Sequence, residues 1–302
     1  MNYRQRTISK QVSCCGVGVH SGNNVNLTIK PAHVNHGIKF VRTDLPGRPK
    51  VNALYSSVVD TSLATVIGSE GVIVSTIEHL MACFSGLSID NALVELDSYE
   101  LPILDGSASY FTKLIMDSGF EDQTNPRCFF VIRKPIEIKQ DGRSVGVYPS
   151  SSCQITCTID FEHPLIKTQS FSIDLSDKEF SENISDARTF GFLKDYETLK
   201  RYDLARGASL ETGVVMDNND ILNKEGLRYD DEFVRHKLLD CMGDFALLGM
   251  PILGHIVAHK SGHAFNHAFL KEFLDRKDSW ETLPLNSTEK THQFGSLETA
   301  SL

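Results

Sequence analysis

The stretch Phe233-Val-Arg-His-Lys-Leu-Leu-Asp-Cys-Met-Gly-Asp244 sets a row of ionisable groups into an otherwise apolar segment. Its apolar residues recur at helical spacing, so the stretch predicts an α-helix on which His236, Asp240 and Asp244 share one face. Burying a carboxylate without compensation costs several kcal/mol. This face therefore needs a cation or hydrogen-bond donors opposite it.

A His and an Asp four residues apart can converge on one divalent metal ion, which supplies that compensation. Asp244 lies roughly 12 Å along the helix axis from His236, which is too far to complete the same coordination shell, so we expect it to orient another group. Pairs with this spacing also form caps and ion pairs. Taken alone, the pair favours a structural role.

Composition places the chain among ordinary globular proteins. It has 302 residues, of which 41% are hydrophobic and 23% charged, and a net charge of -9 argues against a nucleic-acid-binding protein. The polar N-terminus predicts no signal peptide. The longest apolar run, residues 245 to 258, is interrupted by Gly and Pro and falls short of the roughly 20 residues that a membrane span needs. Seven cysteines without a Cys-x-x-Cys pair indicate reduced thiols, so we expect a soluble, cytoplasmic protein.

Turn residues and charges at Ser118 to Arg127 mark the best domain boundary. We expect an N-terminal domain over residues 1–122, a C-terminal domain over residues 127–280, and a flexible tail over residues 281–302. Hairpin-like strands mixed with helices indicate an α+β fold rather than a βαβ winding. The expected strands cover residues 25–29, 38–41, 92–96, 128–132, 136–138, 144–147, 154–159 and 169–173, and helices are expected at 76–85, 110–116 and from about 231.

A second polar group occurs in Ser75-Thr-Ile-Glu-His-Leu80. Ser75 followed by Glu78 fits a helix capping box. Alternatively, His79 is a third metal ligand and Glu78 a base acting on water, because catalytic zinc uses three protein ligands and one open position. The site would then lie between the two halves, where pockets are common.

Four histidines recur every fourth residue in Gly254-His-Ile-Val-Ala-His-Lys-Ser-Gly-His-Ala-Phe-Asn-His267. The β-branched residues and glycines predict a strand that ends at Lys260-Ser-Gly262, not one long helix. His263 would then occupy a strand-to-helix turn, a favourable position for a reactive side chain. The alternative is a surface histidine, and His267 is expected to face solvent.

Several long motifs occur in order along the chain: Thr76-Ile-Glu-His-Leu80, Ile184-Ser-Asp-Ala-Arg-Thr-Phe-Gly-Phe192, Glu232-Phe-Val-Arg-His-Lys-Leu-Leu-Asp240 with Gly243-Asp244, and Lys260-Ser-Gly-His-Ala264. They resemble the motifs of the LpxC family, the bacterial UDP-3-O-acyl-N-acetylglucosamine deacetylases of lipid A synthesis. The resemblance runs from Gly16-Val-Gly-Val-His-Ser-Gly22 through Leu104-Asp-Gly-Ser-Ala108 to about residue 280. It implies two domains of similar topology, each a β-sheet packed with two helices, with the active site in the cleft between them.

The resemblance also implies the chemistry. It assigns one zinc ion to His79, His236 and Asp240, although iron(II) could replace zinc in the cell. Glu78 corresponds to the general base that activates water. His263 corresponds to a protonated histidine that stabilises the oxyanion and donates to the departing amine. Asp244 would keep that histidine oriented and charged, since an amine leaves poorly without a proton.

Further residues are assigned to catalysis and substrate by the same resemblance. Thr189 would add an oxyanion donor, or it is simply a turn residue. Phe190 and Phe192 would line a passage for the fatty acyl chain, or they belong to the ordinary core. The remaining substrate candidates are Lys237 and Lys260 for phosphate or sugar, Asp160 and Phe161 for the nucleotide, and His20 in a Gly-rich turn.

We therefore expect a cytoplasmic enzyme that catalyses one reaction. That reaction is the zinc-dependent hydrolysis of the N-acetyl amide of UDP-3-O-(3-hydroxyacyl)-N-acetylglucosamine. The expected partner is that acylated UDP-amino sugar, with no nucleic acid and no membrane span, and the chain is expected to be a monomer. Two alternatives stay open. One is a metallo-amidase for another N-acetyl sugar. The other is a non-enzymatic protein with a structural metal site, in which Glu78 or His263 would be a fourth ligand.

Overall fold

The computed structural model describes residues 2–285. Within that range the chain forms nineteen strands, six α-helices and two short 3-10 helices. The α+β prediction is confirmed. The helices are α1 (Glu78–Gly86), α2 (Ser109–Ser118), α3 (Asp177–Asn183), α4 (Leu193–Arg201), α5 (Glu232–Phe245) and α6 (His263–Asp275), with 3-10 turns at Tyr55–Ser57 and Ala246–Leu248.

The first half of the chain forms a five-stranded sheet in the order β2-β3-β9-β4-β5. Only β4 and β9 run parallel in it. Along β3, Val25, Leu27 and Ile29 are buried while the residues between them are exposed or partly exposed, which is the alternation of a sheet with one face on a core. All strands of this half, including those outside the sheet, are β1 (Arg4–Ile8), β2 (Val12–Val17), β3 (Asn24–Pro31), β4 (Ile38–Arg42), β5 (Lys50–Asn52), β6 (Val58–Asp60), β7 (Val66–Ser69), β8 (Val72–Val74) and β9 (Ala92–Leu96).

The second half forms a seven-stranded sheet around β18. One edge of β18 pairs with β13, and the other pairs with β11 near its start and with β14 further along. The sheet contains β11 to β15, β18 and β19. All strands of this half are β10 (Phe120–Pro126), β11 (Cys128–Ile132), β12 (Ile136–Gln140), β13 (Arg143–Tyr148), β14 (Cys153–Phe161), β15 (Lys167–Asp174), β16 (Phe190–Phe192), β17 (Val214–Met216), β18 (Ile252–His259) and β19 (Trp280–Pro284).

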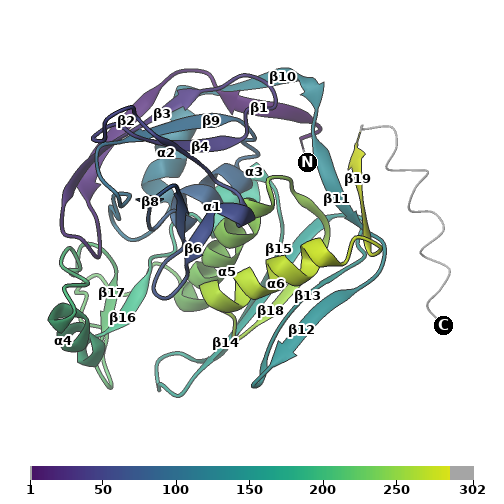
Figure 1. The fold of residues 1–302 in the computed structure, drawn as a ribbon. Helices are drawn as coiled ribbons and strands as arrows, with labels where there is room; N and C mark the ends of the chain where they lie inside the picture. The colour runs from purple at the N-terminus through teal and green to yellow at the C-terminus, as the bar shows by residue number, and fades with distance from the viewer. Residues whose placement is uncertain (1, 286–302) are drawn as a thin grey trace, which may run out of the picture.

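Helices α1, α5 and α6 lie between the two sheets, with the first sheet above and the second below in the view of Figure 1. Helix α1 packs on α5, and α5 packs on α6 and on β14. Buried residues from both halves, including Phe84, Phe111, Phe233 and Phe269, belong to one hydrophobic core. Because the core is shared, the two halves are stabilised by each other, and the proposed division into two domains at residues 122–127 stays a prediction.

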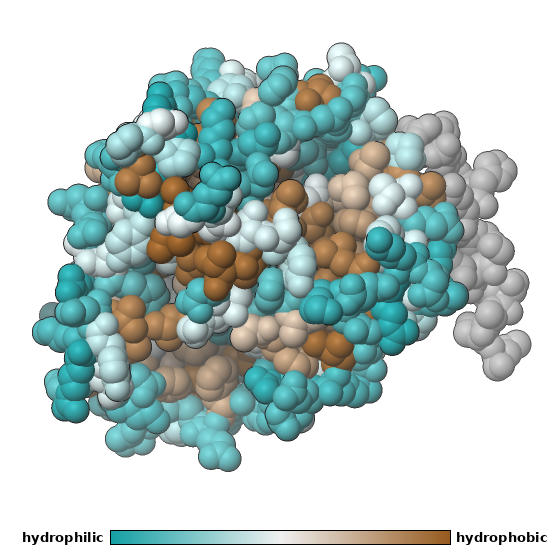
Figure 2. All heavy atoms as spheres, in the orientation of Figure 1, coloured by the Kyte–Doolittle hydropathy of each residue, from teal (hydrophilic) through white to brown (hydrophobic). Residues whose placement is uncertain are grey.

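Two insertions extend from these layers. Strands β6, β7 and β8 form a small sheet in the first half. In the second half, the short parallel pair of β16 and β17 carries α4 at the lower left of Figure 1. In Figure 2, hydrophobic side chains gather in a hollow beside this second insertion.

Two segments that the sequence suggested as a domain boundary and as a tail contain regular secondary structure. The segment expected to be a boundary forms strand β10, which pairs antiparallel with β1. Gln123 is buried there, and the Arg6 guanidinium lies over the Phe120 ring. Residues 281–285 of the expected tail are ordered: β19 pairs with β11, and Leu285 packs on Phe129. The rest of the tail prediction, residues 286–302, lies outside the described residues.

The local predictions around the two polar motifs have different outcomes. The capping box is wrong, because Thr76 has a positive φ of 59° and α1 begins only at Glu78. The strand-turn-helix prediction is confirmed, since β18 ends at His259 and α6 begins at His263. His267 does not simply face solvent: its ring stacks on Tyr55 with centroids 4.6 Å apart.

Candidate functional site

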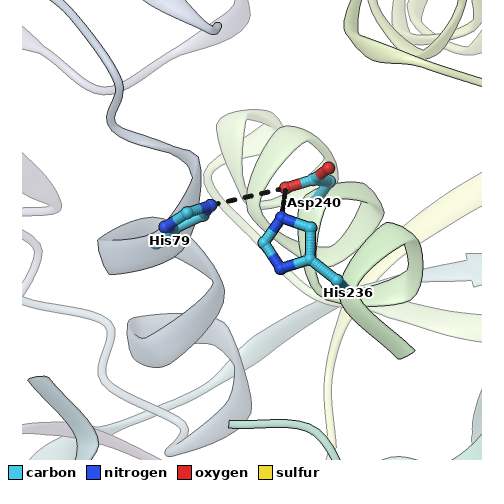
Figure 3. Close-up of side chains that lie close together, drawn as sticks. All are labelled: His79, His236 and Asp240. Atoms are coloured by element: carbon cyan, nitrogen blue, oxygen red, sulfur yellow. Dashed lines mark ion pairs between the residues drawn. The ribbon is translucent and has the colours of Figure 1, made fainter. Parts of the chain in front are cut away.

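The first functional cluster, which we call the His79 group, consists of His79, His236 and Asp240 (Figure 3). Helix α1 supplies His79, and α5 supplies the other two from successive turns. One potential ligand atom from each residue lies within 4.8 Å of the others. Asp240 Oδ1 is 3.3 Å from His236 Nε2 and 3.7 Å from His79 Nε2. Each residue is at most 5% exposed.

The donor chemistry of the His79 group fits a divalent metal ion. The His236 Nδ1–H donates to the Ala187 carbonyl at 3.0 Å, which leaves Nε2 as a bare lone pair beside Asp240. Burial lowers the pKa of His236 to about 3, so its ring is neutral, as a ligand must be. Two imidazoles and one carboxylate are a common ligand set for zinc.

Asp240 uses its two oxygens differently. Oδ1 faces the histidines, while Oδ2 accepts from Lys237 Nζ at 2.5 Å. Burial alone would raise the pKa of Asp240, but the Lys237 ammonium group outweighs it and holds that pKa well below its usual range. Asp240 is therefore a carboxylate, and one of its oxygens is available to an ion.

A glycine on α5 brings the two helices into contact. A Cβ at Gly243 would lie 2.1 Å from the Glu78 carbonyl oxygen, which is closer than any side chain tolerates. Only glycine lets α5 approach the first turn of α1 this closely. This contact carries His79, from the first half, to the face of α5 that presents His236 and Asp240.

The second cluster, which we call the Glu78 group, consists of Glu78, Asp244 and His263. Glu78 is 4% exposed, and its Oε2 accepts from the Thr65 backbone N–H at 3.0 Å. Its Oε1 lies 3.9 Å from His263 Nε2. Burial raises the pKa of Glu78, although His263 and His79 oppose that shift. A carboxyl group with a raised pKa can accept a proton at neutral pH and release it again.

His263 carries the complementary protonation preference. Its Nδ1–H donates to Asp244, with Oδ2 at 2.9 Å and Oδ1 at 3.1 Å. Burial alone would lower the pKa of His263, but the Asp244 and Glu78 carboxylates raise it to about 10. Asp244 also accepts from Asn266 Nδ2 at 2.8 Å. The Glu78 group thus sets a potential base opposite a potential acid.

Both groups open into one cavity of about 620 Å³. Its walls include four predicted substrate residues, His20, Phe190, Phe192 and Lys237, and the predicted oxyanion donor Thr189. Most of the remaining wall is apolar and comes from the second insertion, with Leu193, Tyr196, Leu199, Val214, Val215 and Leu222 among its residues. A large apolar cavity that ends at polar groups is suited to an amphipathic ligand.

The structure places three predicted substrate residues outside the walls of this cavity. Lys260 Nζ forms an ion pair with Asp160 Oδ2 at 2.5 Å, and both side chains are more than a third exposed. Phe161 packs against Phe190 and Phe192, with ring centroids 5.8 and 6.4 Å away, so it supports the wall from behind. Lys237, by contrast, is one of the four substrate candidates that line the cavity, and its ammonium group donates a hydrogen bond to Asp240.

Sequence reasoning missed two buried polar residues that hold the site. Thr65 contacts both Glu78 and Asp244, and nothing in its short polar segment indicated this. Glu100 is fully buried and accepts from the backbone N–H groups of His20 and Ser21 and from the Thr76 hydroxyl. A lone Glu between apolar segments was a weak signal that could have been noticed.

Sequence reasoning also missed a buried ion pair that supports the segment carrying Thr189. Arg188 is 3% exposed and Glu232 is fully buried. Arg188 Nε donates to Glu232 Oε1 at 2.8 Å, and the Arg188 backbone N–H donates to the same oxygen at 2.9 Å. Both residues stand inside the motifs quoted above, so their position was visible, but their pairing was not.

Comparison with known proteins identifies the family of this chain. The family model described as LpxC, UDP-3-O-acyl N-acetylglycosamine deacetylase, matches residues 5–275. The chain belongs to this family. Among curated relatives, the UDP-3-O-acyl-N-acetylglucosamine deacetylase of Myxococcus xanthus is 50% identical over 288 residues, which cover 95% of this chain and 92% of that protein.

Other LpxC relatives are nearly as similar. The protein of the same name from Syntrophus aciditrophicus is 44% identical over 96% of this chain and 92% of its own length. That from Idiomarina loihiensis is 44% identical over 95% of both chains. The family resemblance inferred from the motifs is thus confirmed. Separately, none of the helices within residues 2–285 has the length and apolar character needed to cross a membrane.

Proposed function

We propose that this LpxC-family chain hydrolyses the N-acetyl amide of a UDP-3-O-acyl-N-acetylglucosamine, releasing acetate and a free amine. The observation that carries the proposal is the adjacency of the His79 group and the Glu78 group at the polar end of one apolar cavity. Family membership and the relatives' names support the same substrate class. Glu78 and His263 have environments that favour opposite roles, one as base and the other as acid.

His79, His236 and Asp240 would hold one divalent metal, zinc by the ligand set, with iron(II) as the alternative. Such an ion would polarise the acetyl carbonyl and make water easier to deprotonate. Glu78 would take the proton from the attacking water as oxygen adds to the carbonyl carbon. His263, held protonated by Asp244, would stabilise the oxyanion and then give its proton to the amide nitrogen as the C–N bond breaks.

The remaining candidates would bind and position the substrate. Thr189 borders the cavity near the two groups, and we assign it a hydrogen bond to the developing oxyanion. Phe190 and Phe192 would contact the acyl chain, and His20 and Lys237 the sugar. Asp160, Phe161 and Lys260 lie beyond the cavity wall, so their proposed contacts with the nucleotide require a substrate that extends past the insertion.

We place this reaction in the cytoplasm, carried out by a monomer. No disulfide bond joins any of the seven cysteines, all of which lie in the described part of the chain, and this agrees with a reducing compartment. The cavity's apolar wall favours an acylated substrate over an unacylated N-acetyl sugar. A closed structural metal site would need a fourth protein ligand, whereas the His79 group has three members.

The first experiment is a deacetylase assay on UDP-3-O-(3-hydroxyacyl)-N-acetylglucosamine, before and after chelation, with metal content measured on the same sample. We expect turnover that is lost on chelation and returns with zinc, at about one ion per chain. The same sugar nucleotide without its acyl chain is the matched substrate control. Equal rates on both substrates would refute the acyl contact, and bound metal without turnover would refute the deacetylase assignment.

A further inference from the structure

Thr65 forms hydrogen bonds to both the potential base, Glu78, and the carboxylate behind the potential acid, Asp244. It lies directly before β7 and is 2% exposed. Its backbone N–H donates to Glu78 Oε2 at 3.0 Å, and its hydroxyl donates to Asp244 Oδ1 at 2.5 Å. Its carbonyl accepts from the Ile77 backbone N–H at 3.4 Å, at the start of α1. All the polar groups of Thr65 are therefore directed to this site.

The hydrogen bonds of Asp244 show what the hydroxyl does. Oδ2 accepts from His263 Nδ1 and from Asn266 Nδ2, at 2.9 and 2.8 Å. Oδ1 accepts from the Thr65 hydroxyl and, more weakly, from His263 at 3.1 Å. Without the hydroxyl, Oδ1 would keep only the longer contact. The carboxylate plane, and the His263 ring that follows it, would lose the donor that fixes their rotation.

The geometry also couples this bond to the base. The Thr65 hydroxyl oxygen lies 3.3 Å from His263 Nδ1, while the amide of the same residue holds the Glu78 carboxylate. Displacement of Thr65 would therefore move the acid and the base together. Separate supports would allow each of them to drift independently, and catalytic groups lose rate rapidly when their mutual positions relax.

We propose that Thr65 is a positioning residue that sets Glu78 and His263 in register, through its amide on one side and through Asp244 on the other. Thr65 is not among the residues that line the cavity, so it would act through Glu78 and Asp244. The inference rests on the proposed deacetylase function. It goes beyond that function because it assigns the alignment of acid and base to a residue in the first-half insertion.

The test compares variants that differ by one hydroxyl. Thr65→Val keeps the side-chain shape and the amide bond to Glu78 but removes the donor to Asp244. We expect kcat to fall about ten- to hundredfold, as for other residues that orient a catalytic group, with KM and bound metal unchanged. Thr65→Ser restores the hydroxyl and should return kcat to within about threefold of the parent protein.

Thr112→Val is the matched control. Thr112 is also a buried threonine, 4% exposed, but its hydroxyl donates to the Ala108 carbonyl beside α2. We expect this variant to keep the parent kcat. If Thr65→Val fails to fold, Thr65→Ala and Thr65→Ser form the next pair, since they too differ only by the hydroxyl. Equal kcat for that pair would overturn the proposal.

A double-mutant cycle separates positioning from a general packing role. If the hydroxyl acts through Asp244, Thr65→Val should cost less than about twofold in kcat when Asp244→Asn is already present. A purely structural role predicts the same loss in both backgrounds, and that result would overturn the proposal. Bound metal is measured in all four proteins, so that any loss of the ion is recognised.

A spectroscopic measurement makes the outcome independent of turnover. The His263 Nδ1–H proton is observed by NMR in the metal-free protein, where Thr65→Val should shift it and Thr112→Val should not. An unchanged resonance in Thr65→Val would contradict the proposal. Absence of deacetylase activity in the parent protein would instead refute the proposed function, while the resonance would still report on the contact.

Discussion

The His79 group and the Glu78 group share helices α1 and α5, with His263 added from α6, yet their environments give their histidines different protonation states. Burial keeps His236 neutral, with a pKa of about 3, whereas the carboxylates around His263 raise its pKa to about 10. The difference follows from hydrogen-bond partners. His236 donates to a neutral carbonyl, and His263 donates to a carboxylate. One hydrogen-bond partner thus separates a neutral imidazole from a protonated one.

The largest effect should come from removing a ligand of the His79 group. Asp240→Ala takes away the carboxylate that faces both histidines. We expect metal content to fall below about one tenth of an ion per chain and kcat/KM to fall by roughly 10⁴-fold, because the ion would stabilise the transition state by several kcal/mol. Metal analysis and steady-state kinetics check this. Full metal content with little activity would assign Asp240 to the other group.

Changing the base should be nearly as severe but should leave the ion in place. Glu78→Gln keeps the size of the side chain and removes its ability to take a proton. We expect kcat to fall by about 10² to 10⁴, with metal content unchanged. The matched control is Glu121→Gln on the exposed face of β10, which should behave as the parent protein. Loss of metal in Glu78→Gln would support a closed structural site.

Neutralising Asp244 should have a smaller effect on rate and a clear effect on its pH dependence. Asp244→Asn should lower kcat about ten- to hundredfold. It also removes the main cause of the raised pKa of His263. The protonated ring would then be lost at lower pH, so the alkaline limb of kcat/KM should move toward neutrality. A pH profile of parent and variant measures the shift, and coincident alkaline limbs would exclude His263 as the acid.

The acyl contact should be weaker still. Phe192→Ala removes an aromatic ring from the apolar wall of the cavity and leaves both groups unchanged. We expect kcat/KM on the acylated substrate to fall about tenfold, in line with about 1 to 2 kcal/mol of lost apolar contact. The rate on the unacylated sugar nucleotide should not change. Parallel losses on both substrates would assign Phe192 to folding rather than to the acyl chain.

The last effect concerns stability rather than catalysis. The folded-state pKa of His263, about 10, is above its ordinary value of 6.5, so folding favours the protonated ring. This contribution is fully present below the ordinary pKa and is lost as pH rises through the folded value. The free energy of unfolding of the metal-free protein should therefore decline over that alkaline range, and should decline less in His263→Gln. Urea titrations at several pH values test this.

The sequence predicted the parts of the site that follow from local periodicity. The helix of His236, Asp240 and Asp244 was visible because polar residues at four-residue spacing interrupt an apolar pattern. The turn before His263 was visible because β-branched residues and glycines delimit it. Its proximity to Glu78 was not local information, and it came from the family resemblance.

The misses share another physical cause, which is tertiary contact overriding local preference. Ser75 and Glu78 have the spacing of a capping box, but Glu100 accepts from the Thr76 hydroxyl, and Thr76 adopts a left-handed backbone that delays the helix. Segment 118–127 has turn composition, yet β1 provides a strand to pair with. Thr65 has no local signal at all, because its partners lie 13 and 179 residues away.

Gly243 has a consequence for the folding of the whole chain. Because it lets α1 and α5 touch, an ion held by the His79 group would cross-link segments that are far apart in sequence. Closing so long a loop removes much entropy from the unfolded chain, as a disulfide does. An ion bound only by the folded form would also raise stability with its own free concentration. The ion would then be a reversible cross-link in a fold that contains no disulfide among its described residues.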